Sequence, residues 1–146
     1  MNVRTGLVIA SLLAVAGCAS MSPGGGRTLG PGSCTSQNCP DITVSVASCQ
    51  VSVDLDPMDV ARGNHDVNMV WKLDLWSRMT GYAFDDPAIV VKTPPPPPNE
   101  FRITPGMYTV TVHNRNSANK TYTYAVKVKR WGTACNPSDP TIINQG

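Results

Sequence analysis

Five cysteines and two histidines are the side chains of this sequence with the widest chemical range. Thiolate and imidazole groups bind metals, and both can also act as nucleophiles or bases. A structural zinc site needs close thiolate pairs, but Cys34 and Cys39 are loosely spaced in CTSQNC, and the sequence has no second close pair. A blue-copper site needs two histidines, a cysteine and a weak axial ligand. The segment after Cys135, NPSDPTI, has neither histidine nor methionine. We therefore expect no metal site and no cofactor.

The histidines and acidic pairs do not form a recognisable catalytic arrangement. His65 precedes Asp66, and a carboxylate can orient an imidazole, but RGNHD is a turn sequence in which polar residues are common. His113 falls on the outward face of a predicted strand. Asp85 and Asp86 are adjacent, so on a strand they would face opposite sides, and we interpret them as part of a turn. The sequence contains no G-x-S-x-G, H-E-x-x-H or phosphate-binding glycine loop. These observations predict a protein that is not an enzyme.

The segment before Cys18 has the order of a secretory signal. MNVRTG carries one positive charge, at Arg4, and the apolar stretch LVIASLLAVAG follows it. That run of about a dozen residues is shorter than the roughly 20 that a transmembrane helix needs. We therefore predict a cleaved signal peptide over residues 1–17.

The cleavage point resembles the lipobox of bacterial lipoproteins, because Val15, Ala16 and Gly17 lie directly before Cys18. The resemblance implies diacylation of the Cys18 sulfur, cleavage before it, and acylation of the new amine. Two or three acyl chains would anchor the protein stably. Ala19 stands where an aspartate tends to retain such lipoproteins in the inner membrane. The resemblance thus implies a lipid anchor in the cell envelope, at the outer membrane and facing the periplasm. The alternative is an ordinary signal peptide with a nearby cysteine.

The four remaining cysteines, Cys34, Cys39, Cys49 and Cys135, suit disulfides in an exported chain. Four thiols allow three connectivities. Cys49 lies on the inward face of an early strand and Cys135 follows the last long one, so a bridge between them would tie the ends of the domain together. Cys34 would then pair with Cys39. The sequence favours this pairing and leaves the other two open.

The chain divides into an anchor, a tether and one domain. After Cys18 comes ASMSPGGGRTLGPGS, which has too few large apolar groups to order itself. A flexible stretch of that length spans about 20 Å. We predict a lipidated tether over residues 18–40 and a single folded domain over residues 41–146.

The charges nearly cancel, with 10 acidic and 12 basic residues in the whole sequence. The densest basic run, AVKVKRW, alternates with apolar residues as a solvated strand face does. A nucleic-acid surface would show a basic patch or stripe. We therefore expect no nucleic-acid partner.

From Asp41 onward the apolar residues recur with a period of two, which is typical of strands. The parity of ITVSV differs from that of CQVSVDL, so a bend is expected at Ala47 and Ser48. A helical turn or two is expected only near LDLWSRMTG. The pattern predicts six to eight short antiparallel strands in an immunoglobulin-like β-sandwich, with a small barrel as the alternative.

Two stretches, DPMDVARGNHDVNMVWKLD and the later TYTYAVKV, are similar to uncharacterised bacterial envelope proteins with small sandwich domains. The similarity implies the same fold and brings no activity with it.

The aromatic residues and the proline run are the remaining binding candidates. Trp71 is in phase with the core, whereas Trp76 and Trp131 lie at strand ends, where an indole can stack on a sugar or a partner. TPPPPPN is expected to be a stiff loop between strands, although such runs are also bound by adaptor domains. We predict a binding or structural module with an envelope protein or a glycan as its partner. The alternative is a carbohydrate- or small-ligand-binding module that uses Trp76, Tyr82 and Trp131.

Overall fold

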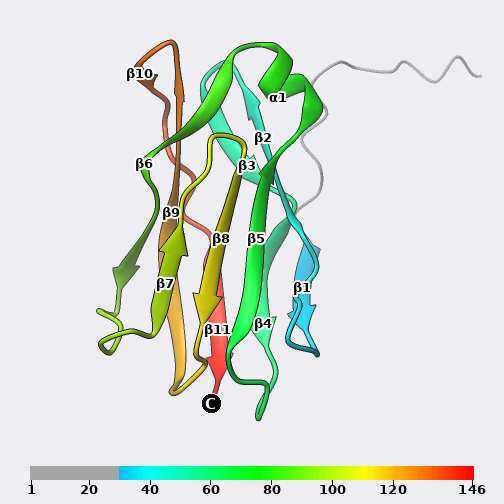
Figure 1. Ribbon diagram of the computed structural model, residues 1–146, viewed down its shortest axis with the longest axis vertical. Helices are drawn as coiled ribbons and strands as arrows, with labels where there is room; N and C mark the ends of the chain where they lie inside the picture. The colour runs from blue at the N-terminus through cyan, green and yellow to red at the C-terminus, as the bar shows by residue number, and fades with distance from the viewer. Residues whose placement is uncertain (1–29) are drawn as a thin grey trace, which may run out of the picture.

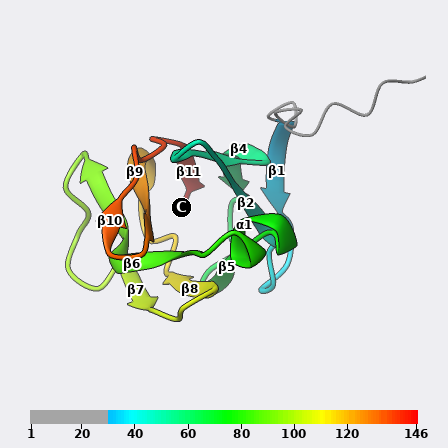
Figure 2. The ribbon, with the colours of Figure 1, turned by 90° about the horizontal axis from the view of Figure 1, so that it is seen from above.

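The computed structural model describes residues 30–146, which form eleven strands and one short helix. The predicted signal peptide and the predicted lipidation at Cys18 lie outside the described residues. The strands make two sheets that pack face to face (Figure 1, Figure 2). The first sheet contains β1 (Gly30–Cys34), β4 (Leu55–Val60), β6 (Tyr82–Thr93), β9 (Asn119–Arg130), β10 (Thr133–Ala134) and β11 (Thr141–Gln145). The second contains β2 (Ile42–Ala47), β3 (Gln50–Val53), β5 (Val67–Leu73), β7 (Phe101–Thr104) and β8 (Thr109–Asn114). The prediction of an all-β sandwich is confirmed.

The strand directions correct the expected antiparallel arrangement at three places. The first sheet has the order β1-β4-β11-β9-β10, with β6 also paired to β9, and the second has the order β3-β2-β5-β8-β7. The pairs β1/β4, β4/β11 and β2/β5 are parallel. β3 and β4 follow one another directly and carry the chain from one sheet to the other, so β2 and β5 run in the same direction. β11, the last strand in the sequence, lies between β4 and β9.

The core lies between the sheets and follows the predicted alternation. In β5, Val67, Met69, Trp71 and Leu73 are all buried. The Trp71 indole donates a hydrogen bond of 3.1 Å to the hydroxyl of Tyr124 in β9, and the two rings meet edge to face at 5.4 Å. Burial raises the pKa of Tyr124, because its anion would lose solvation. This pair joins the two sheets at the centre of the molecule.

Two disulfides close the fold at its edges. One joins Cys34 to Cys39, with 4.5 Å between their Cα atoms, and the other joins Cys49 to Cys135, with 4.7 Å. This is the pairing that the strand pattern favours. Cys49 lies in the turn between β2 and β3, which corrects its predicted place on the inward face of a strand. Cys135 follows β10, so the second disulfide ties the two sheets together. Disulfides persist outside the reducing cytoplasm, and their presence indicates an extracytoplasmic protein.

The described fold begins earlier than the boundary expected at residue 41. β1 is a strand formed by residues assigned to the tether, and it pairs with β4 through Gly32↔Met58 and Cys34↔Val60. A side chain at position 32 would lie 2.8 Å from the Met58 methyl group, so glycine lets the two strands approach closely. Backbone pairing and the Cys34 disulfide hold this strand, which the apolar pattern therefore did not reveal.

Candidate functional site

One end of the sandwich gathers the exposed apolar side chains. We call it the apolar end, and it consists of Leu75, Trp76, Met79, Met107, Tyr108 and Trp131. Within residues 30–146 these six are all of the large apolar side chains that are strongly exposed. They come from α1 (Leu75–Met79), from the turn between β7 and β8, and from the turn between β9 and β10. Helix α1 and the β9–β10 turn both lie at this end, far from the carboxyl terminus (Figure 1).

Helix α1 is oriented so that Ser77 faces inward. Ser77 is fully buried, and its hydroxyl accepts a hydrogen bond of 2.8 Å from the backbone amide of Val46. Asp74 caps the helix by accepting a bond of 2.6 Å from the Ser77 amide. Leu75, Trp76 and Met79 therefore point outward, with Trp76 68% exposed. A surface helix ordinarily shows the opposite arrangement. Here local hydrogen bonds fix an apolar face toward solvent.

Trp131 is held out by a tight turn. Arg130 pairs with Thr133, so Trp131 and Gly132 form a two-residue hairpin loop, with φ of 50° and 84°. Positive φ at both positions is typical of a type I′ turn, which prefers asparagine and glycine. A bulky residue in this region is uncommon and costs conformational energy. The fold nevertheless places a tryptophan there with 81% of it exposed.

Arginines lie against the rings of the apolar end. The Arg130 guanidinium carbon is 4.1 Å from the centre of the Trp131 ring, and its Nε donates a bond of 3.0 Å to the carbonyl oxygen of Thr80. Arg78 lies over Tyr108 at 6.0 Å. These contacts connect α1 with both turns. The rings of Trp131 and Tyr108 are therefore in contact with arginines before any partner binds.

Of the three aromatic residues proposed from the sequence for ligand binding, two are exposed and one is buried. Trp76 and Trp131 are more exposed than expected from packing at strand ends. Tyr82 is only 5% exposed, with Arg130 over its ring at 5.2 Å and its hydroxyl accepting a bond of 3.3 Å from the Cys49 amide. Its ring offers no face to a ligand, because it begins β6 and packs inward. The proposed role of Tyr82 is therefore corrected.

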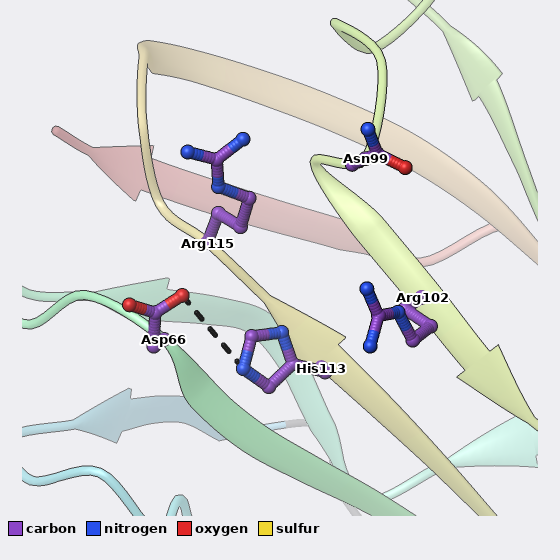
Figure 3. A pocket seen from close by; sticks show the side chains of 5 residues that line it. All are labelled: Asp66, Asn99, Arg102, His113 and Arg115. Carbon is purple, nitrogen blue, oxygen red and sulfur yellow. Dashed lines mark ion pairs between the residues drawn. The ribbon is translucent and has the colours of Figure 1, made fainter.

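A polar hollow lies toward the opposite end, on the outer face of the second sheet (Figure 3). We call it the arginine pocket, and it is lined by Asp66, Asn99, Arg102, His113 and Arg115. Its volume is about 340 Å³. Arg102 of β7 lies directly across from His113 of β8, and His113 Nε2 is 3.7 Å from an Asp66 carboxylate oxygen. His113 faces outward, as its parity predicted, but it belongs to a cluster that the sequence did not reveal.

A buried hydrogen-bond network supports the loops that carry this pocket. Glu100 is 1% exposed and accepts bonds from the Ser117 amide, at 3.0 Å, and from the Asn144 side chain, at 2.8 Å. Asn144 and Asn114 exchange two further bonds, of 2.7 and 3.0 Å. The Arg115 amide donates to the Glu100 carbonyl at 2.9 Å. These bonds fix the backbone on both sides of the pocket.

The other chemical candidates are placed apart from one another. His65 lies in its predicted turn, with Nδ1 3.1 Å from the carbonyl oxygen of Asn116. Asp85 and Asp86 lie within β6 rather than in a turn, where the register of pairing shifts, and Asp85 pairs with Lys129 at 3.2 Å. The pKa of Asp85 is lowered, chiefly by a hydrogen bond from the Asp86 backbone. In the described part of the chain no three His, Cys, Asp or Glu side chains group as a metal site would require.

No model of a known protein family matches the chain, and no curated protein matches it either. The function is therefore inferred from the fold, the apolar end and the arginine pocket. Among residues 30–146, no helix has the length and apolar character needed to cross a membrane.

Proposed function

We propose that this protein is a lipid-anchored module of the bacterial cell envelope that acts without catalysis, by binding a protein partner at its apolar end. The observation that carries the proposal is the outward apolar face of α1. Ser77 is buried and hydrogen-bonded while Leu75, Trp76 and Met79 face solvent. Exposing such a surface is unfavourable in water, and contiguous exposed apolar patches mark interaction sites.

The chemistry of this end suits a protein surface. Tryptophan, tyrosine, methionine and arginine are the residues enriched in protein interfaces, and the first two and arginine dominate binding energy there. The apolar end has two tryptophans, with arginines on Trp131 and Tyr108. Because Arg130 is also bonded to Thr80, less side-chain freedom is lost on binding. Leu75, Met79 and Met107 add apolar area that a sugar, with its hydroxyl groups, would use less well.

The anchor in this proposal comes from the lipobox-like residues before Cys18. Acylation there, with Ala19 as the next residue, would hold the domain at the outer membrane on the periplasmic side. The two disulfides support an extracytoplasmic location. An immunoglobulin-like relationship is a further part of the proposal, supported by the two-sheet architecture.

The test is site-specific photocrosslinking in intact cells. A photoreactive phenylalanine analogue is introduced at position 76 or at position 131, and Thr121, an exposed residue of β9 paired with Ile143, serves as the control position. We expect positions 76 and 131 to capture the same protein and position 121 not to capture it. Placing a charge in the surface, by Met79→Asp, should abolish capture from position 131.

Three results would contradict the proposal. Crosslinks to lipid alone would indicate that the apolar end rests on a membrane. Tryptophan fluorescence that responds to an envelope glycan and depends on Trp76 and Trp131 would favour the carbohydrate-binding alternative. Equal capture from position 121 would show that the contact is not specific to this end.

A further inference from the structure

The arginine pocket combines several hydrogen-bond donors with very little negative charge. Arg102 and Arg115 each bring a guanidinium group, Asn99 brings an amide, and His113 brings an imidazole. Asp66 is the one carboxylate that lines the hollow. Within residues 30–146 neither guanidinium has an ion pair or a side-chain hydrogen bond. Two guanidinium groups therefore line one hollow that contains a single carboxylate.

The register of the strands brings two donor side chains together. Arg102 and His113 are direct partners across the β7/β8 pair, where opposing side chains lie about 5 Å apart. An anion bound beside them is attracted to the Arg102 guanidinium and can accept a hydrogen bond from an imidazole N–H. Figure 3 shows Arg102, His113 and Asp66 in a row across the strands, with Arg115 and Asn99 beside them.

The nearest other carboxylate does not neutralise the pocket. Glu100 lies next to Asn99 in sequence, but its side chain is turned into the core and binds Ser117 and Asn144. The same bonds hold the backbone that carries Asn99 and Arg115, so the points from which these two side chains extend are fixed before a ligand arrives. A fixed backbone lowers the cost of binding, because less of the chain has to be ordered.

We infer that the arginine pocket is a binding site for a phosphate group. Guanidinium groups bind phosphate oxygens in paired, charge-assisted hydrogen bonds. Four donor side chains match the oxygens of a phosphate better than the two of a carboxylate. The pocket is open and shallow enough, at about 340 Å³, to take a phosphate that is part of a larger molecule. This site lies apart from the apolar end and does not depend on the proposed partner.

The experiment measures binding of two probes to the full chain purified from membranes in an uncharged detergent. The probes are inorganic phosphate, and dihexanoyl phosphatidylglycerol, a soluble lipid that carries the phosphodiester of a membrane headgroup. Titration calorimetry gives the affinity for each. We expect Arg102→Gln and Arg115→Gln each to weaken binding about tenfold or more, because each removes a charge-assisted contact.

Two further variants distinguish a binding site from a structural or general charge effect. Lys127→Gln removes the same charge from β9, in the other sheet, and should leave the affinity unchanged. Asp66→Asn removes the one competing carboxylate and should strengthen binding, a gain that damage to the fold would not produce.

The two probes identify the source of the phosphate. Binding of inorganic phosphate that depends on both arginines supports a free or terminal phosphate as ligand. Binding of the lipid alone, with the same dependence, supports a headgroup. Binding of neither probe, or equal weakening by Lys127→Gln, would overturn the inference.

Discussion

Replacing Trp131 with asparagine tests separately how this residue affects the stability of the fold and whether it binds a partner at the surface. Position 131 has φ of 50° in a two-residue turn, a conformation that asparagine adopts more readily than tryptophan. The conformational gain from Trp131→Asn is about 1 kcal/mol.

The substitution also removes favourable contacts of Trp131, and their loss is similar in size to the conformational gain. Since 81% of Trp131 is exposed, about a fifth of an indole residue of roughly 200 Å² is covered, or about 40 Å². At about 25 cal/mol per Å² this burial is worth about 1 kcal/mol. The contact with Arg130, at 4.1 Å, adds about 0.5 kcal/mol. The substitution should therefore change the free energy of unfolding by less than about 1 kcal/mol.

The assay is urea unfolding followed by circular dichroism, together with crosslinking from position 76. We expect a nearly unchanged midpoint with an unchanged slope, and loss of the crosslinked partner. Trp71→Phe is the matched control, because Trp71 is buried and bonded to Tyr124, and its replacement should cost at least about 2 kcal/mol. A loss above about 2 kcal/mol for Trp131→Asn would show that the residue serves the fold. Undiminished crosslinking would refute its role in binding.

Three other predictions concern the anchor, the second disulfide and the helix. Cys18→Ala should abolish incorporation of a labelled fatty acid, and equal label on both proteins would refute lipidation. Replacing both Cys49 and Cys135 with serine should lower the free energy of unfolding by about 4 kcal/mol, because the disulfide closes a loop of 86 residues. Denaturant unfolding measures this loss, and an unchanged midpoint would count against the prediction. Ser77→Ala should cost about 1 to 3 kcal/mol, because it leaves the buried amide of Val46 without an acceptor; a neutral effect would mean that another group takes over that bond.

The sequence predicted those elements in which side chains alternate, and missed those held by other forces. β5 was predicted because Val67, Met69, Trp71 and Leu73 repeat with a period of two and all face the core. β1 was missed because its pairing depends on backbone bonds and on a close approach at Gly32. The parallel pairings were missed because the direction of β2 relative to β5 depends on where the chain crosses between sheets.

The candidate sites could also be predicted only in part from the sequence. Local pattern placed Trp76 and Trp131 at strand ends, but their exposure depends on the burial of Ser77 and on a turn that tryptophan rarely occupies. The arginine pocket could not be found from the sequence, because Arg102 and His113 meet only in the register of β7 against β8. An outward residue in each of two strands is visible in the sequence, but their pairing is not.

The position of β11 has a consequence for how the protein matures. This strand comes after all the others in the sequence, yet it pairs with β4 on one side and with β9 on the other. Because β11 follows β4 and β9 in the sequence, each of these strands has an unpaired edge in the first sheet until β11 is in place. Open edges invite pairing with other chains. The interval before β11 inserts is therefore the stage at which this protein is most exposed to aggregation, and a variant that lacks Thr141–Gln145 should accumulate as aggregate rather than as a slightly weakened fold.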